Sequence, residues 1–215
     1  DTERAKLGNI LQTFNGNPSD STFVSAMGNL QVINMLNTKY FILGERGKEV
    51  VLPNAAANGA AWFVSAIHPV NNADEEIAAL STQDLKRTAV IHQEWTGTAG
   101  AAGDGQGSIS LKSYEPNKLE YESQSNGDQI AVLSEIWYGP DLGWEATIDG
   151  KPAELFRANY ALRALRVPAG THKIVLEFKP SSYRTGETMS LLGSGILLLL
   201  LGFVAWKNYQ KKEDQ

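Results

Sequence analysis

The sequence contains no cysteine, and only three histidines and three methionines among its 215 residues. Without cysteine the chain has no disulfide bond and no thiolate metal site, although this absence fits an oxidising compartment as well as a reducing one. The body of the chain also lacks a cluster of lysine or arginine, and the net charge is -5 with a pI near 5.3. Nucleic-acid binding needs a basic face, so we expect no nucleic-acid partner.

The common catalytic signatures are missing as well. His68, His92 and His172 lie on different expected strands, without the short spacing of a zinc motif. The chain has no G-x-S-x-G stretch for a nucleophilic serine, and no pair of carboxylates that the sequence singles out for glycoside hydrolysis. We therefore expect no catalytic residue, no metal and no bound cofactor in this chain.

A long apolar run is present near the C-terminus. MSLLGSGILLLLLGFVAW, residues 189–206, is uncharged and would be about 27 Å long as a helix at roughly 1.5 Å per residue. It is apolar all round, whereas a buried helix of a soluble domain keeps a polar stripe, so it predicts a transmembrane helix. Because Lys207, Lys211 and Lys212 follow at once, the positive-inside rule puts residues 207–215 in the cytoplasm and the folded part outside.

The other end of the sequence carries no export signal. The chain begins with Asp1 and has no apolar segment there that could carry a domain across a membrane. We therefore expect the sequence to be the C-terminal end of a longer membrane protein, with an upstream transmembrane part as its partner.

The fold class expected is α+β, with a small N-terminal α/β subdomain, then an antiparallel β-sandwich, then one transmembrane helix. Residues 1–28 are polar, include the turn-rich NGNPSDS, and are interpreted as a lead-in segment. Residues 29–96 are expected to form the α+β subdomain. Its elements would be a short helix over 30–36, a strand over 40–43, and one strand each in EVVLP, AWFVSAIHPV and TAVIHQEW.

A second helix is expected within NNADEEIAALSTQDLKR. Asn72 can cap its N-terminus, and Glu75, three residues on, can complete a capping box. The spacing predicts that Ile77 and Leu80 face inward.

The stretch GTAGAAGDGQG, residues 97–107, has five glycines in eleven residues. It lacks the Gly-Lys-Ser/Thr ending of a phosphate loop, and it is interpreted as a flexible linker or hairpin loop at the subdomain boundary. After it, residues 108–180 alternate apolar and polar side chains between short turns, which is typical of an antiparallel sandwich. Whether the two subdomains share one core stays open at this stage.

A hairpin is predicted in GWEATIDGKPAEL, with Asp149-Gly150 as a two-residue turn. The spacing would place Trp144 opposite Leu155 on the apolar face, and Glu145 opposite Glu154 on the other.

The densest unusual patch is SEIWYGPDLGW, in which acidic and aromatic residues surround a Pro-Asp turn. Aromatic rings can stack on sugar faces, although they serve equally well in a core. With two polar residues that follow the hairpin, the candidate glycan-binding residues are Glu135, Trp137, Tyr138, Trp144, Arg157 and Asn159.

Three stretches occur in order before the last expected membrane span, namely VINMLNTKYFIL, WFVSAIHPVNNADEEIAAL and LSEIWYGPDLGWEATIDGKPAELFRANYALRALRVPAGTHKIVLEFKP. Together they resemble the C-terminal region of the YfhO family of bacterial multi-spanning membrane proteins. The likeness covers most of residues 29–206. The turn Gly139-Pro140-Asp141-Leu142-Gly143 is looser than the usual Tyr-Pro-Gly-Trp of the family.

The resemblance implies a membrane glycosyltransferase of the GT-C type in the bacterial cytoplasmic membrane. Such a protein would move a sugar from a polyprenyl-phosphate carrier, its donor, onto a cell-envelope polymer at the outer face. The acidic catalytic residue of such enzymes lies in a first outer loop, upstream of this chain, so the chain itself is expected to be non-catalytic. Residues 180–188 would connect the sandwich to the last span, and the aromatic patch would contact the acceptor glycan or cover the upstream active site.

An alternative of a different class remains open. The chain can also be interpreted as a membrane-anchored, non-catalytic β-sandwich module that binds glycan or a partner protein in the envelope.

Overall fold

The structure is a computed structural model and describes residues 2–13, 21–43 and 46–213. The helices are α1 (Thr2–Thr13), α2 (Ser21–Gly28), α3 (Gln31–Met35), α4 (Ala73–Leu80), α5 (Thr96–Ala99) and α6 (Ser181–Glu213), with 3-10 turns η1 (Gln93–Trp95) and η2 (Pro140–Leu142). The strands are β1 (Tyr40–Leu43), β2 (Val50–Pro53), β3 (Ala61–Val64), β4 (Ala66–Val70), β5 (Thr88–His92), β6 (Ser108–Glu115), β7 (Lys118–Ser125), β8 (Gln129–Ile136), β9 (Trp144–Ile148), β10 (Lys151–Ala153), β11 (Leu155–Ala158), β12 (Leu162–Val167) and β13 (Gly170–Phe178).

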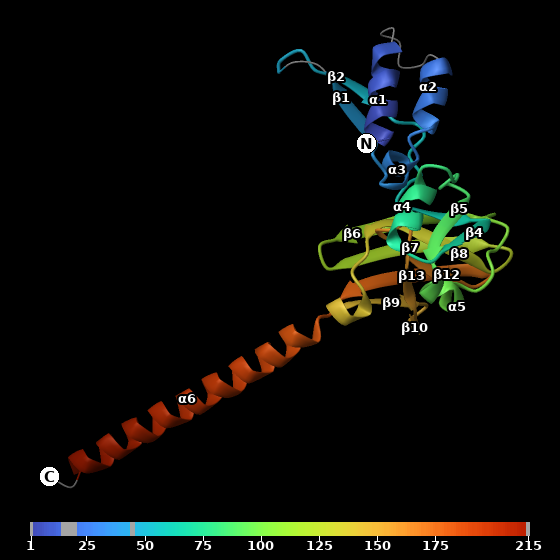
Figure 1. Cartoon of the computed structure of the whole chain (residues 1–215). Helices are drawn as coiled ribbons and strands as arrows, with labels where there is room; N and C mark the ends of the chain where they lie inside the picture. The colour runs from blue at the N-terminus through green and yellow to red at the C-terminus, as the bar shows by residue number, and fades with distance from the viewer. Residues whose placement is uncertain (1, 14–20, 44–45, 214–215) are drawn as a thin grey trace.

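Two antiparallel sheets packed face to face form the centre of the molecule (Figure 1). The five-stranded sheet has the order β10-β9-β13-β7-β6, and the four-stranded sheet has the order β11-β12-β8-β3. Alternate residues of both sheets fill the space between them, as period-two patterning requires. Leu119, Ile174 and Leu176 come from the first sheet, and Leu133 and Leu165 from the second. The predicted sandwich and the α+β class are confirmed.

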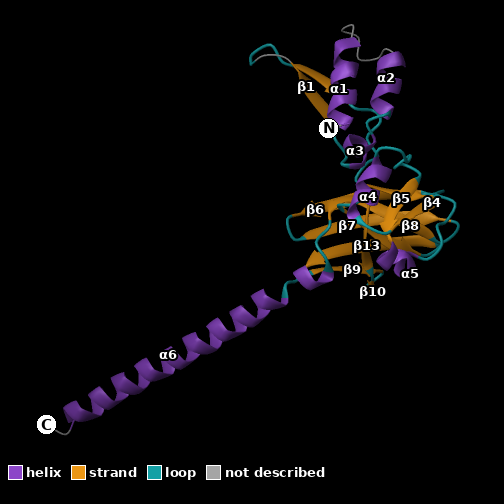
Figure 2. Ribbon diagram, viewed as in Figure 1, coloured by secondary structure: helices purple, strands orange, loops and turns teal. Residues whose placement is uncertain are grey.

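A third layer covers the outer face of the four-stranded sheet. It consists of the parallel pair β4–β5 and the helix α4 that connects them (Figure 2). Ile130 and Val132 of β8 point into this layer, while Ala131 and Leu133 point between the two sheets. Strands buried on both faces have nearly continuous apolar sequences, which explains the run IAVL in β8.

The prediction of one strand in AWFVSAIHPV is wrong, because the segment forms two strands in different sheets. β3 pairs with β8 in the sandwich, and β4 pairs with β5 in the third layer. The break is at Ser65, whose backbone N–H donates to the carbonyl of Arg87 at 2.8 Å. A strand of the expected subdomain 29–96 is therefore built into the sandwich expected over 108–180, and the two segments share one apolar core.

The N-terminal residues form a smaller unit at the opposite end from α6 (Figure 1). α1 and α2 pack on the β1–β2 hairpin around Leu30 and Leu52, which are buried. The segment 1–28, expected as a lead-in, thus contains two helices, while most of NGNPSDS lies outside the described residues. The predicted helix over 30–36 and strand over 40–43 are confirmed as α3 and β1.

The N-terminus of α4 is as the sequence predicts, but the helix buries a different face from the predicted one. The side chain of Asn72 accepts a hydrogen bond from the N–H of Glu75 at 2.9 Å, so the predicted N-cap is confirmed. Leu80 is buried, but the prediction for Ile77 is wrong, because it is 49% exposed and Glu76 takes the inward position. The buried carboxylate of Glu76 finds a cationic partner inside the fold, which periodicity does not reveal.

The predicted hairpin forms and ends earlier than expected. Asp149 and Gly150 both have positive φ, 50° and 78°, which matches the twist of a tight two-residue hairpin turn. Ala153 pairs with Ala146, as predicted, but the chain then crosses to the other sheet at Glu154. The predicted pairs of Trp144 with Leu155 and of Glu145 with Glu154 are therefore wrong. Phe178 and Glu177 of β13 lie opposite Trp144 and Glu145 instead.

The glycine-rich segment 97–107 begins with the end of α5, and residues 100–107 form a loop packed on the sandwich. The N–H of Gly105 donates to the side-chain oxygen of buried Gln129 at 3.0 Å, and the amide of Gln129 donates to Asp104 at 2.5 Å. A side chain on Gly103 or Gly107 would collide with backbone atoms of the sandwich. The glycines thus allow close approach of the loop to the turn before β8.

α6 leaves the sandwich as one continuous helix (Figure 1). Its stretch Thr185–Val204 is long and apolar enough to cross a membrane, and none of it is buried in the protein. The prediction of a C-terminal apolar helix is confirmed. The expected connection over 180–188 is almost entirely helical, because α6 begins at Ser181 and only Lys179 and Pro180 separate it from β13.

Candidate functional site

The candidate site is the end of the sandwich next to α6, which we call the mouth. At this end the five-stranded sheet finishes with the pair Trp144 and Phe178, and the four-stranded sheet finishes with the pair Leu162 and Ile136. Six polar or aromatic residues interact with one another at this end, through their charges or a ring contact. They are Tyr114, Tyr121, Glu135, Tyr138, Trp144 and Arg163.

Arg163 is the central residue of the mouth. It lies on β12 opposite Leu133 and is only 2% exposed. Its guanidinium carbon is 4.1 Å from the centre of the Trp144 ring, which in turn packs against Phe178 at 5.6 Å between ring centres. The Nε and Nη1 atoms are buried and have no hydrogen-bond partner among the described residues. A buried guanidinium normally pairs its donors, so these two unpaired nitrogens are the unusual feature of this end of the sandwich.

Glu135 and Tyr121 surround this guanidinium without pairing with it. Burial raises the pKa of Glu135 above its usual range, and the charge of Arg163 opposes that shift. Burial likewise lowers the pKa of Arg163 and raises that of Tyr121 well above its usual range. The hydroxyl of Tyr121 is buried without a partner within the described part of the chain. The mouth therefore holds a desolvated positive charge, an acid that protonates easily, and an unpaired hydroxyl.

Three of the six sequence-predicted residues lie in the mouth, namely Glu135, Tyr138 and Trp144. Trp137 packs against the same core between the two sheets as Trp144 does. Its ring meets Trp95 edge-on, with centres 5.5 Å apart and an angle of 66° between the planes.

Arg157 and Asn159 belong to a structural network beside the mouth. Arg157 donates to Glu76 on α4 at 3.0 Å. Asn159 is fully buried and clamps β5, because its side-chain oxygen accepts from the N–H of Val90 at 2.9 Å and its own N–H donates to the carbonyl of Val90 at 2.7 Å. These bonds tie Asn159 to β5, while its side-chain nitrogen is buried without a partner among the described residues.

Arg163 and Tyr121 were missed by the sequence reasoning. In YALRALRV both faces of β12 are apolar except at the arginines, because the strand lies in the middle layer. A lone charge in a strand that is buried on both faces was the available signal. Tyr121 follows the ordinary alternation of β7 and carried no such signal.

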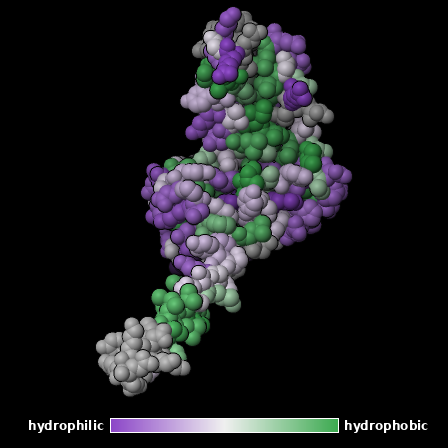
Figure 3. All heavy atoms as spheres, turned by 90° about the vertical axis from the view of Figure 1, so that its left-hand side faces the viewer, coloured by the Kyte–Doolittle hydropathy of each residue, from purple (hydrophilic) through white to green (hydrophobic). Residues whose placement is uncertain are grey.

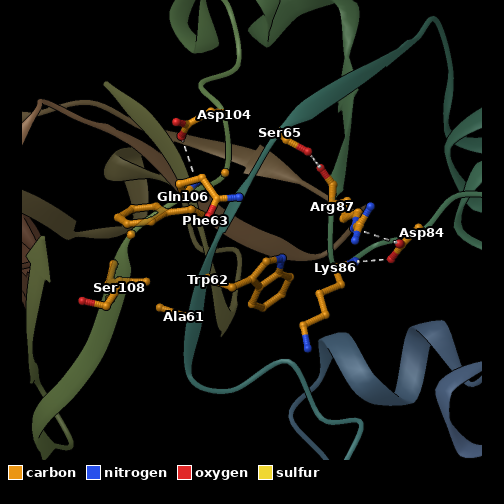
Figure 4. A pocket seen from close by; sticks show the side chains of 13 residues that line it. Ala61, Trp62, Phe63, Ser65, Asp84, Lys86, Arg87, Asp104, Gln106 and Ser108 are labelled. Carbon is orange, nitrogen blue, oxygen red and sulfur yellow. Dashed lines mark hydrogen bonds and ion pairs between the residues drawn. The ribbon is translucent and has the colours of Figure 1, made fainter. Parts of the chain in front are cut away.

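A separate groove of about 760 Å³ lies at the edges of β3 and β6 (Figure 4). Lys86 and Arg87 line one wall, and Asp104 lies on the glycine-rich loop across from them. The acids here have partners close at hand, since Asp84 lies 3.8 Å from Arg87 and Asp104 accepts from Gln106 at 2.8 Å. We do not take this groove as the candidate site, because its two acids already pair with neighbouring residues.

The described residues contain no group of three or more histidine or acidic side chains that could hold a metal ion. His172 instead lies at the far turn, 2.6 Å from Asp149. The mouth can bind through unpaired guanidinium donors and aromatic faces. Guanidinium donors suit an oxyanion or a hydroxyl-rich ligand, and ring faces suit a sugar.

Comparison with known proteins gives one match. Residues 101–190 match the family model described as bacterial membrane protein YfhO. This segment contains β6 to β13, the mouth and the first turns of α6. No curated protein and no solved structure matched the chain significantly.

Proposed function

We propose, from the premise that residues 101–190 belong to the YfhO family of bacterial membrane proteins, that this chain serves a membrane glycosyltransferase. In this proposal the enzyme transfers a sugar from a polyprenyl-phosphate donor onto a cell-envelope polymer. The sandwich contributes no catalytic residue and contacts the acceptor glycan. The observation that carries the proposal is Arg163, buried with two unpaired nitrogens against Trp144.

The proposed location is the bacterial cytoplasmic membrane, with the sandwich outside and residues 207–215 inside. The lysines after the apolar stretch of α6 support this orientation. A single cysteine at Tyr40, which is exposed on β1, should react with a membrane-impermeant maleimide in intact cells. Reaction only after the cells are lysed would reverse the orientation.

The test of function uses the full-length enzyme in membranes and measures transfer at varied acceptor concentration. Arg163→Met and Trp144→Ala should raise the acceptor KM roughly tenfold and leave kcat nearly unchanged, because they remove binding made equally in ground and transition states. Tyr40→Ala is the matched control, since that ring is exposed on the N-terminal unit away from the mouth. Unchanged kinetics in both mouth variants, with protein levels intact, would refute the acceptor role.

A fall in kcat alone would instead give the mouth a part in the reaction itself, contrary to the proposed non-catalytic role. Glu135→Gln is the sharpest variant for this question. The raised pKa of Glu135 is the property that a general acid needs. The proposal expects the kcat of the Glu135→Gln enzyme to equal that of the unmodified enzyme.

A second candidate function is a membrane-anchored module that binds glycan or a partner protein without serving transfer. The unpaired nitrogens of Arg163 favour this second function, because binding a ligand through them would not depend on an active site elsewhere in the protein. Saturable glycan binding by this chain in nanodiscs, lost in Arg163→Met, together with normal transfer by the full-length variant, would select this function.

A further inference from the structure

Exposed aromatic and apolar side chains surround the root of α6. We call these five residues the rim, and each is between 37% and 69% exposed. They come from five separate places in the chain. The rim residues are Tyr114, Tyr138, Leu142, Phe178 and Tyr183.

Backbone contacts gather the rim around Pro180. The N–H of Phe178 donates to the carbonyl of Asn117 at 2.9 Å, which brings the β6–β7 turn and Tyr114 to this end. Leu142 is followed by Gly143, which packs against Pro180. The N–H of Tyr183 donates to the carbonyl of Pro180 at 3.2 Å. Figure 3 views this end of the molecule, with the apolar α6 emerging below the sandwich.

The joint between the sandwich and α6 is short and is held by backbone contacts. The N–H of Lys179 donates to the carbonyl of Gly143 at 2.6 Å. Gly143 has φ of 103°, and an added Cβ would lie 2.7 Å from Pro180. With only Lys179 and Pro180 between strand and helix, the direction of α6 fixes which end of the sandwich faces the membrane.

The length of α6 before its apolar stretch would place its root near the lipid headgroups. The apolar stretch begins at Thr185, four residues into α6 from Ser181, which is about 6 Å of helix at roughly 1.5 Å per residue. The headgroup region is about 5–7 Å thick on each side of the hydrocarbon core. With Thr185 at the hydrocarbon boundary, Tyr183 would lie within the headgroup layer, and Phe178 and Leu142 would lie at its outer boundary.

We infer that the rim is a membrane-docking surface that inserts into the lipid headgroup region and orients the sandwich on the bilayer. Tyrosine suits this depth, because its ring is apolar and its hydroxyl can hydrogen-bond to headgroups and water. Two lysines near the rim are paired with acids, since Lys179 lies 2.6 Å from Glu177 and Lys118 lies 2.8 Å from Glu120. The mouth would then open at the membrane surface.

This inference rests on the membrane helix and not on the proposed glycosyl transfer. A comparable apolar surface on β1 and β2 includes Tyr40, Ile42 and Val51, each more than half exposed. That surface belongs to the N-terminal unit, at the opposite end of the molecule from α6 (Figure 1). It provides a control of similar chemistry without the neighbouring bilayer.

Because this chain has no natural cysteine, a single introduced cysteine can be labelled specifically. Single-cysteine variants Tyr114→Cys, Leu142→Cys and Tyr183→Cys are labelled with a fluorophore and placed in nanodiscs of phosphatidylethanolamine and phosphatidylglycerol. The nanodiscs carry a lipid with a nitroxide quencher on its headgroup. Tyr40→Cys is the negative control, and Leu197→Cys, in the apolar stretch, marks the membrane interior.

Quenching of the rim labels by the headgroup nitroxide should be several-fold stronger than that of the Tyr40→Cys label. Iodide in the water should quench the rim labels more weakly than the Tyr40→Cys label. Equal quenching at rim and control positions would overturn the inference. Rim labels shielded from both quenchers would also overturn it, because another protein segment would then cover the rim. Either result leaves the kinetic test of Arg163 unaffected.

Discussion

Arg163 and Trp144 join the two sheets of the sandwich, with the guanidinium carbon 4.1 Å from the ring centre. Arg163 belongs to the four-stranded sheet and Trp144 to the five-stranded sheet. A desolvated cation–π contact contributes about 2 kcal/mol, whereas burying an ion costs several kcal/mol. The contact offsets only part of the cost of burying Arg163, and we attribute the remainder to a function in binding.

We predict that Arg163→Met leaves the free energy of unfolding unchanged or raises it by roughly 1 kcal/mol. The reason is that an apolar side chain of similar length removes the burial cost while keeping the packing on Trp144. Denaturant unfolding of the chain in detergent measures the effect. Leu165→Ala, two residues along the same strand, should by contrast lower it by about 2–5 kcal/mol through a cavity. A loss above about 2 kcal/mol in Arg163→Met would make the arginine a structural residue.

Glu76 and Arg157 provide the second prediction. Glu76 is fully buried, accepts from Arg157 at 3.0 Å, and also accepts from the N–H of Tyr160 at 2.8 Å. Glu76→Ala should lower the free energy of unfolding by about 3–5 kcal/mol, because it leaves a partly buried guanidinium and an N–H without partners.

The double variant Glu76→Met/Arg157→Met should recover much of that loss, since neither charge is then left unpaired. Asp74→Asn, an exposed acid on the first turn of the same helix, should cost less than about 1 kcal/mol. Equal losses at positions 76 and 74 would show that the buried pair contributes nothing specific.

The local part of the fold was predictable from sequence, and the pairing of distant segments was not. The Asp149-Gly150 turn, the Asn72 cap and the apolar helix depend on residues close together in the chain, and all three are confirmed. The division of AWFVSAIHPV at Ser65 depends on β8, more than sixty residues away. Register between distant strands is set by packing on both faces, which a single sequence does not show.

The candidate site was predictable in part for the same reason. Trp144, Tyr138 and Glu135 stand out as a dense local patch, whereas Arg163 joins them only through sheet pairing. Asn159 was selected because it is polar and close in sequence, and its contact with Val90 on β5 reveals a structural role.

The third prediction concerns pH and the pair of His172 with Asp149. Nδ1 of His172 lies 2.6 Å from Asp149, and Nε2 lies 3.0 Å from the carbonyl of Ala169. Both neighbours are acceptors, so the geometry favours the doubly protonated ring. The carboxylate of Asp149 and then the carbonyl of Ala169 raise the pKa of His172, and His172 lowers the pKa of Asp149.

The stabilisation by His172 is complete below its unfolded pKa of about 6.5 and is lost as pH rises through the raised folded pKa. The stabilisation by Asp149 is complete above the unfolded pKa of aspartate, about 3.9, and is lost as pH falls through the lowered pKa of the folded state. We therefore expect stability to decrease above neutral pH and His172→Gln to remove that decrease, measured by thermal unfolding between about pH 6 and 9. An identical pH profile in the variant would exclude His172 as the source. His68→Gln is the control, because no hydrogen bond or ion pair involves that side chain among the described residues.

The last prediction tests the joint between the sandwich and α6. Gly143→Ala should lower the free energy of unfolding by about 2 kcal/mol or more, because positive φ disfavours a side chain and the added Cβ would meet backbone atoms of Pro180. Gly150→Ala separates the two causes, since Gly150 also has positive φ, 78°, but nothing lies within 4 Å of an added Cβ. It should cost only about 1 kcal/mol. If the two variants lose equal stability, the contact with Pro180 is not rigid, and the orientation of the rim on the membrane must be maintained by the lipid contacts alone.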